Sequence, residues 1–231
     1  MDSPPCDAVD VRPLSGTRRV VARRMAESAR SIPAVTLHRR VDVEQVLAFR
    51  DRIGGATGRR PIIDALLAHV TGRALADYDL LNGRWDEEDV AVAIMPRRNV
   101  AVAIDTPRGL TTVVLPDADS RDPIDLDREL AALVERALAH RSRPEDVQGA
   151  TFTLTNLGQL GVDAFTPMIT PGQAGILGIG AIAGEHGSRS ASISLSFDHR
   201  ICDGAYAARF LGRLSELLLT AWSPSAADSP A

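Results

Sequence analysis

Hydrophobic and polar residues alternate over several short stretches of this chain, and a period of two is typical of β-strands with one buried face. The strictest alternation lies in residues 192–197, where serine alternates with isoleucine, leucine and phenylalanine. We expect this strand to be half buried. Shorter apolar runs predict further strands at residues 35–43, 90–95, 99–105, 111–115, 151–155 and 175–182. Of these, the strands at 90–95 and 99–105 are expected to join around Pro96 and Arg97.

Other stretches repeat their apolar residues every three or four positions, which predicts amphipathic helices. Their approximate ranges are residues 15–30, 44–53, 61–75, 123–138 and 204–219. Pro61 is a suitable first residue of the third helix. The glycines at 54, 55 and 58 predict a flexible break after the second helix, and Asn82-Gly83 predicts a turn. Helices interleaved irregularly with strands indicate an α/β fold in which helices cover one face of a mixed β-sheet.

Charge and the two ends of the chain set limits on its partners and location. A net charge of −4, with both signs spread along the 231 residues, predicts no binding to nucleic acid or to an anionic membrane. No apolar run is long enough to cross a bilayer and the first residues are unlike a signal peptide, so we expect a cytoplasmic protein. Disordered tails are expected at residues 1–12 and 223–231, on either side of a single domain at residues 13–222.

Residues 196–204 carry the main candidate for chemistry. They place His199 at the end of the strictly alternating strand, with Asp203 four residues later and Gly204 directly behind it. A histidine at a strand end is a good general base, because imidazole titrates close to neutral pH. Asp203 can brace the turn, and Gly204 lets the backbone bend into the next helix. A lone histidine at such a place would usually just pair with a nearby carboxylate. The surrounding residues therefore decide whether His199 is structural or catalytic.

The run from Asp198 to Gly204 matches a longer signature, Asp-His-Arg-x-x-Asp-Gly. It resembles the catalytic domain of the dihydrolipoyl acyltransferases of 2-oxo acid dehydrogenase complexes, which are chloramphenicol acetyltransferase-like enzymes that depend on coenzyme A. Segments that resemble the same domain, in the same order, are residues 13–25, 99–110, 151–158, 165–167 and 175–180. The resemblance implies a two-layer α/β sandwich with a mixed β-sheet covered by helices, and a coenzyme A-dependent acyltransferase.

The resemblance also implies a role for three side chains. His199 is the base that takes the proton of the incoming nucleophile. Thr155 supplies the hydroxyl that binds the developing oxyanion, at a position where many relatives have serine. Asp203 pairs with an arginine from elsewhere in the chain and fixes the catalytic loop. Candidate partners of Asp203 are Arg18, Arg19 and Arg23.

Other reactive side chains are expected to have no catalytic part. Cys202 lies between His199 and Asp203, and we expect a small buried side chain there rather than a nucleophile. The other histidines lack the spacing of metal ligands, so no metal site is expected. The sequence does not identify the side chains that bind coenzyme A.

This chain departs from the family in ways that bear on its substrate. No lipoyl or subunit-binding domain precedes Pro13, Ala34 stands where relatives usually have histidine, and the segment 183–189 is short. The chain has no lysine, so it cannot carry a lipoyl group of its own. We therefore expect a free-standing enzyme that moves an acetyl or short acyl group from acetyl-CoA, a cosubstrate and not a tightly bound cofactor, to a hydroxyl of a small molecule. A tetronate-like intermediate of bacterial natural-product biosynthesis is the specific expectation.

Two alternatives remain. One is a core subunit of a 2-oxo acid dehydrogenase complex, which transfers acyl groups between dihydrolipoyl groups and coenzyme A. The other is a condensation-type enzyme, a class that shares His-x-x-x-Asp-Gly but usually has a second histidine where this chain has Asp198.

An oligomer is also implied by the resemblance, because family active sites lie between neighbouring subunits. His199 of one copy would then meet Thr155 of the next in a homotrimer. The residues after Leu219 are mostly small or polar, so we expect a discrete trimer rather than a cage of trimers.

Overall fold

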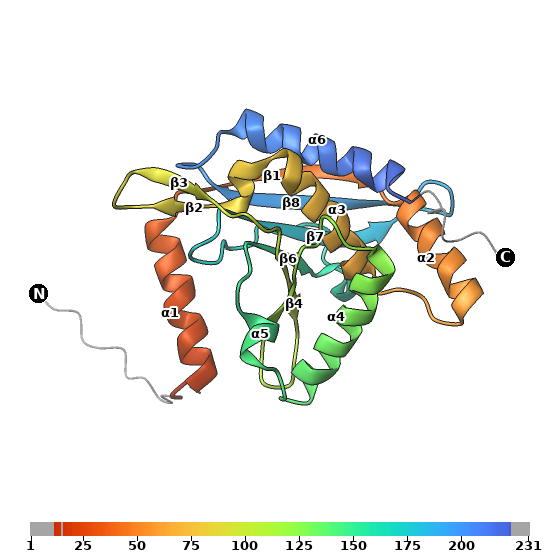
Figure 1. Cartoon of the computed structure of the whole chain (residues 1–231), viewed down its shortest axis with the longest axis horizontal. Coiled ribbons are helices and arrows are strands. Elements are labelled where there is room, and N and C mark those ends of the chain that lie inside the picture. The colour runs from red at the N-terminus through yellow and green to blue at the C-terminus, as the bar shows by residue number, and fades with distance from the viewer. Residues whose placement is uncertain (1–11, 15, 223–231) are drawn as a thin grey trace, which may run out of the picture.

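A six-stranded mixed β-sheet forms the centre of the fold in a computed structural model of the chain, which describes residues 12–14 and 16–222 (Figure 1). The strands follow the order β1 (Ala34–Asp42), β8 (Ser190–Asp198), β7 (Gly175–Ala183), β6 (Phe152–Asn156), β4 (Val100–Ile104) and β5 (Thr111–Leu115). The three strands β7, β6 and β4 run parallel, and the other neighbours pair antiparallel. Apart from Arg12, the predicted tails lie outside the described residues.

Helices lie around this sheet. They are α1 (Gly16–Ser31), α2 (Glu44–Thr57), α3 (Ile63–Asp77), α4 (Pro123–Leu138), the single-turn α5 (Pro144–Val147) and α6 (Gly204–Thr220), with 3₁₀ turns η1 (Asp79–Asn82) and η2 (Gly158–Leu160). Helix α3 contacts both α4 and α6, and α6 lies against β1 and β8 (Figure 1). The predicted α/β sandwich with a mixed sheet covered by helices is confirmed.

The hydrophobic core between the helices and the sheet shows which side chains of β6 and β8 face the helices. Phe152 of β6 and Phe197 of β8 are fully buried, and the Phe152 ring lies 6.2 Å from the ring of Phe210 in α6. Successive side chains of a strand point to opposite faces. Thr153 and Thr155 of β6 therefore face away from α6.

Strand β8 is buried on both faces, so the prediction of a half-buried strand is wrong. Ser194 and Ser196 are 1% and 0% exposed. Their hydroxyls are satisfied by β1, because Ser194 Oγ lies 2.8 Å from His38 Nδ1 and Ser196 Oγ lies 2.7 Å from Thr36 Oγ1. The serine face of β8 is therefore buried, because its hydroxyls hydrogen-bond to the neighbouring strand instead of to water.

A separate two-stranded sheet accounts for a second difference. At the predicted turn, Asn82 ends η1 and Gly83 begins β2 (Gly83–Asp86), which pairs antiparallel with β3 (Ala91–Ile94). Strand β3 therefore pairs with β2, while β4 pairs with β5 and β6 in the central sheet. We call this pair, residues 83–94, the β2–β3 arm.

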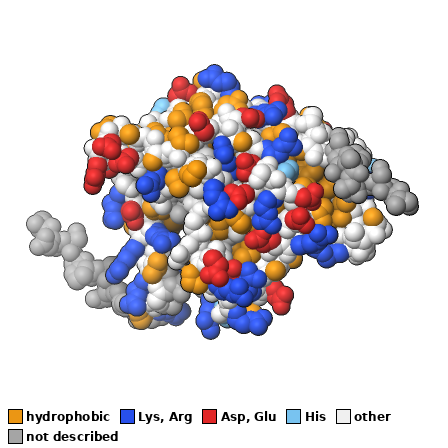
Figure 2. All heavy atoms as spheres, in the orientation of Figure 1, with side chains coloured by type: hydrophobic (Ala, Val, Ile, Leu, Met, Phe, Trp, Pro, Cys, Tyr) orange, Lys and Arg blue, Asp and Glu red, His pale blue; other side chains and the backbone are white. Residues whose placement is uncertain are grey.

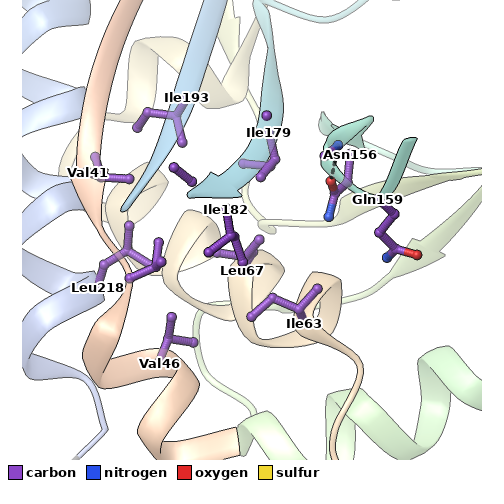
Figure 3. A pocket seen from close by; sticks show the side chains of 14 residues that line it. Val41, Val46, Ile63, Leu67, Asn156, Gln159, Ile179, Ile182, Ile193 and Leu218 are labelled. Atoms are coloured by element: carbon purple, nitrogen blue, oxygen red, sulfur yellow. Dashed lines mark hydrogen bonds between the residues drawn. The ribbon is translucent and has the colours of Figure 1, made fainter. Parts of the chain in front are cut away.

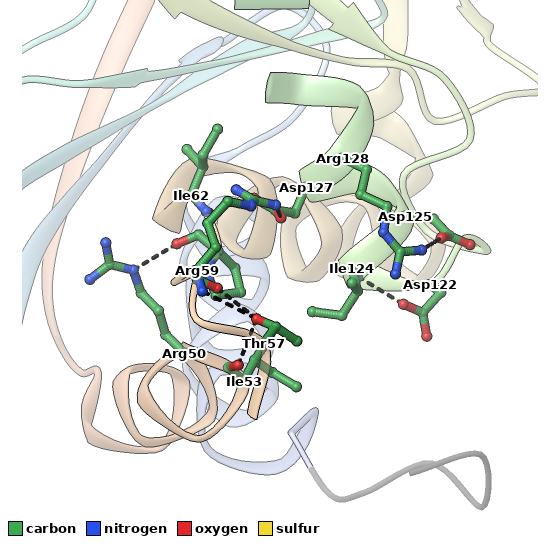
Figure 4. Close-up of polar contacts among 11 residues, drawn as sticks. Arg50, Ile53, Thr57, Arg59, Ile62, Asp122, Ile124, Asp125, Asp127 and Arg128 are labelled. Atoms are coloured by element: carbon green, nitrogen blue, oxygen red, sulfur yellow. Dashed lines mark hydrogen bonds and ion pairs between the residues drawn. The ribbon is translucent and has the colours of Figure 1, made fainter. Parts of the chain in front are cut away.

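The connection between α2 and α3 is ordered by a buried carboxylate (Figure 4). Helix α2 continues through Gly54 and Gly55 to Thr57 and is capped by Gly58, whose φ of 74° is left-handed. The helix is therefore about one turn longer than the predicted range of residues 44–53. Asp127 of α4 is 1% exposed, accepts a 2.7 Å hydrogen bond from Ile62 N and forms an ion pair with Arg59. Hydrogen bonds to a charged group contribute about 1.5–3 kcal/mol each, and the partial exposure of Arg59 places its share at the low end. The contact fixes the start of α3, which begins at Ile63 and not at Pro61.

Candidate active site

His199 lies just beyond the end of β8, in the turn that leads into α6. Its backbone N–H donates a 3.1 Å hydrogen bond to the carbonyl of Pro33, directly before β1. Its ring is tilted against Phe197, with 5.7 Å between the ring centres, and the side chain is exposed. The backbone is therefore held while the imidazole faces outward, as a base that meets an external substrate requires.

The neighbours of His199 in sequence bind each other. Asp198 is 1% exposed, and its carboxylate accepts hydrogen bonds from Arg200 through N and Nε at 3.0 Å and Nη2 at 2.6 Å. A carboxylate held by a guanidinium fork is a strong, directional contact. It closes the chain around His199 and braces the end of β8.

Asp203 caps helix α6. Its carboxylate accepts a 2.7 Å hydrogen bond from Tyr206 N, and an N-cap of this kind stabilises a helix by about 0.5–2 kcal/mol. Among residues 12–14 and 16–222, no arginine lies within 4.0 Å of this carboxylate, so the expected partner is not found there. The placement fits a residue that fixes the loop through the helix rather than through an ion pair.

Thr155 lies far from His199 within one chain. Thr155 of β6 lies opposite Gly178 of β7, and Gly178 lies opposite Ser194 of β8. Strand β8 is therefore two strands away from Thr155 in the sheet. Asp198 is four residues farther along β8, so the Cα atoms of Thr155 and Asp198 are roughly 16 Å apart from strand spacing and rise. The two side chains together reach about half of that, so one chain does not bring the predicted base and oxyanion donor together.

Cys202 has the features of a packing residue. It is 7% exposed, and burial, with smaller contributions from Asp203 and Asp198, raises the pKa of its thiol to about 12. A thiol with that pKa remains protonated at neutral pH and is a poor nucleophile. The interpretation of Cys202 as a small apolar side chain agrees with this environment.

A cavity of about 260 Å³ lies at the opposite end of the sheet (Figure 3). Aliphatic side chains such as Val41, Ile179 and Leu218 line it, with the amides of Asn156 and Gln159 at one side. It adjoins the first residues of β8, whereas His199 follows the last. The cavity is therefore separate from the base of the same chain.

Sequence reasoning missed two polar contacts near these features. Asn156 donates a 2.6 Å hydrogen bond to Asp64 of α3, a carboxyl whose pKa is raised by burial. On the other side of the molecule, the indole of Trp85 in β2 lies against Arg200. No local pattern predicts either contact, because each joins residues about 90 or more positions apart.

The surface offers no single strongly charged patch in the view of Figure 2, where basic and acidic side chains are mixed. Within the described ranges, no group of three or more histidine, cysteine, aspartate or glutamate side chains could hold a metal ion. No helix in these ranges is long and apolar enough to cross a membrane.

Comparison with known proteins identifies the family. The model of the 2-oxoacid dehydrogenases acyltransferase catalytic domain matches residues 6–224, so the chain belongs to this acyltransferase family. One relative is the dihydrolipoyllysine-residue acetyltransferase component of the acetoin cleaving system of Bacillus subtilis, to which the chain is 32% identical over 218 residues. The aligned region covers 89% of this chain and 54% of that protein. The chain thus spans about half the length of that relative.

Solved structures give the same result. The cubic core of a pyruvate dehydrogenase multienzyme complex superposes with a TM-score of 0.87 at 27% identity, over 96% of this chain and 98% of that one. The same values hold for the dihydrolipoamide acetyltransferase of Azotobacter vinelandii, studied for the role of a serine, a histidine and an asparagine in its catalytic mechanism. Chloramphenicol acetyltransferase matches at a TM-score of 0.55 and 15% identity, which confirms the expected fold.

These relatives correct the expected function. An O-acetyltransferase of natural-product biosynthesis is wrong, because the matched proteins are acyltransferases of the acetoin cleaving system and of pyruvate dehydrogenase complexes. A small-molecule hydroxyl as acceptor has no support for the same reason. The lack of lysine, on which that expectation depended, shows only that residues 1–231 carry no lipoyl group themselves. It does not decide which nucleophile the site accepts.

Proposed function

We propose that this chain is the catalytic core of a dihydrolipoyl acyltransferase, which transfers an acetyl or short acyl group between coenzyme A and the thiol of a dihydrolipoyl group. The observation that carries the proposal is the family match over residues 6–224 together with an exposed His199 held at the end of β8. The dihydrolipoyl group is carried outside residues 1–231, because these residues contain no lysine. Coenzyme A acts as a cosubstrate.

The reaction exchanges one thioester for another. His199 accepts the proton of the attacking thiol as its sulfur adds to the thioester carbonyl. The hydroxyl of Thr155 donates a hydrogen bond to the oxyanion that forms on the former carbonyl oxygen. When this tetrahedral intermediate collapses, the bond to the leaving sulfur breaks and the imidazolium returns its proton to that sulfur. No oxidant or metal is consumed, and the same steps run in either direction.

The spacing of the catalytic residues in a relative supports these assignments. In the Azotobacter vinelandii enzyme, the histidine and the asparagine studied for catalysis are four residues apart, as His199 and Asp203 are here. An aspartate in place of asparagine keeps an oxygen that accepts the hydrogen bond of Tyr206 N. The role of Asp203 in this proposal is to hold the turn through that cap.

The proposal includes a homotrimer in which each site is completed by two copies. The Cα atoms of Thr155 in β6 and Asp198 in β8 are roughly 16 Å apart. The side chains of Thr155 and His199 of one chain therefore cannot meet at one reaction centre. A closed ring with one repeated contact brings His199 of one copy to Thr155 of the next at three equivalent sites.

An acyl-exchange assay tests the function. The purified protein is mixed with acetyl-CoA and dihydrolipoamide, and S-acetyldihydrolipoamide and free coenzyme A are quantified by mass spectrometry. Mass detection is needed because one thiol is consumed for each one released, so a thiol reagent would register no change. We expect the two products in equal amounts, and none with oxidised lipoamide, which has no thiol. Hydrolysis to acetate without transfer to dihydrolipoamide would contradict the proposal.

A further inference from the structure

Arg200 is held on two sides. On one side it is bound to the buried carboxylate of Asp198 through three nitrogen atoms, as described above. On the other side, the β2–β3 arm places the ring of Trp85 against its guanidinium, with 5.0 Å from Cζ to the ring centre. A guanidinium within about 6 Å of an indole face is attracted by it. Arg200 therefore joins the arm to the strand end that precedes His199.

The ring of Trp85 is itself oriented within the arm. Its Nε1–H donates a 2.7 Å hydrogen bond to Glu87, whose carboxylate lies 3.4 Å from Arg200 Nη1. Glu87 is 83% exposed, so its ion pair with Arg200 contributes little in water. Trp85 is half buried, and the stacked ring is the part of the arm that confines Arg200.

His199 lies in the short segment between these fixed groups. Its backbone N–H is bound to Pro33, and the next residue is Arg200, fixed by Asp198 and Trp85. A cavity of about 210 Å³, lined in part by Glu27, Trp85 and Arg200, adjoins the stack. Loss of the indole would enlarge this space and leave the guanidinium room to move. The direction of the imidazole depends on the same turn.

We propose that Trp85 is a positioning residue for acyl transfer: the β2–β3 arm clamps Arg200 against Asp198 and thereby fixes the direction in which His199 presents its imidazole. This inference rests on the proposed function, in which His199 is the base. It adds a contact from a segment more than 100 residues earlier in the chain. Trp85 itself touches no reacting atom.

The variant Trp85→Leu tests the clamp in the acetyl-CoA and dihydrolipoamide assay. We expect kcat to fall about 10-fold to 100-fold, with KM for both substrates changed less than about twofold, because a displaced base affects the chemical step more than binding. Trp85→Phe keeps an aromatic face and should retain most of the activity. Arg84→Leu, on the opposite face of the same strand, is the matched control and should behave as wild type. An unchanged kcat in Trp85→Leu would overturn the proposal.

A double variant separates this proposal from the proposed function. If Trp85 acts through the base, Trp85→Leu should cause no further loss in a His199→Ala background, since residues that act as a unit are not additive. If the fold-loss of kcat in the double variant equalled the product of the fold-losses in the two single variants, the clamp would be refuted. High activity of His199→Ala alone would refute the role of His199 instead. Melting temperature and light scattering on each variant show whether a loss arises from unfolding or dissociation, and a loss explained by either would count against positioning.

Discussion

Replacing His199 by alanine is expected to lower kcat for acetyl transfer about 10²-fold to 10⁴-fold, the usual contribution of a positioned general base. The substituted side chain is exposed and its backbone hydrogen bond to Pro33 is kept, so the fold should be unaffected. Steady-state kinetics with acetyl-CoA and dihydrolipoamide measure the change, and the melting temperature checks the fold.

The matched control for this variant is His186→Ala. His186 is another exposed histidine, 88% exposed and 3.4 Å from Glu44, at the far end of β8. It should retain wild-type kcat. If His199→Ala kept more than about a tenth of the wild-type rate, His199 would not be the base.

Replacing Thr155 by alanine is expected to lower kcat about 10²-fold to 10³-fold, the usual effect of losing one donor to an oxyanion. Thr155 is half buried at the end of β6, and a smaller side chain fits there without strain. The binding of coenzyme A should change much less than kcat, because the oxyanion exists only in the transition state and the intermediate.

Thr155→Ser is the decisive companion to this variant. Serine keeps the hydroxyl and removes only a methyl group, so it should remain within a few-fold of wild type. Thr155→Val removes the hydroxyl and keeps the shape, and it should be as impaired as alanine. Equal activity of the serine and valine variants would show that the hydroxyl of Thr155 has no part in the reaction.

Most of the fold could be predicted from local pattern, and the failures have a common cause. The apolar periods located the strands of the central sheet and the long helices within a few residues. Strand β2 was missed because its four residues, Gly83–Asp86, carry no alternation and are stabilised by pairing with β3. The covered polar face of β8 was missed because the partners of Ser194 and Ser196 lie 156 and 160 residues earlier.

The candidate site divides in the same way. The motif around His199 could be found because its residues are contiguous, and the contacts within its turn span two to four residues. The hydrogen bond from His199 to Pro33 is the long-range contact that no local pattern predicts. The clamp of Trp85 on Arg200 depends on tertiary packing, which no short pattern encodes. The acceptor was predicted wrongly because the absence of lysine in residues 1–231 bears on where a lipoyl group is attached and not on which nucleophile the site accepts.

Co-expression of two inactive variants tests the shared active site most directly. Thr155→Ala subunits keep His199, and His199→Ala subunits keep Thr155, so a mixed trimer contains contacts where both functional side chains meet. With equal, random assembly, about one contact in four is complete, and activity should recover to about a quarter of wild type. Native mass spectrometry confirms the mixed trimers, and transfer to dihydrolipoamide gives the rate. Mixed trimers as inactive as either parent would contradict a site formed by His199 of one copy and Thr155 of the next.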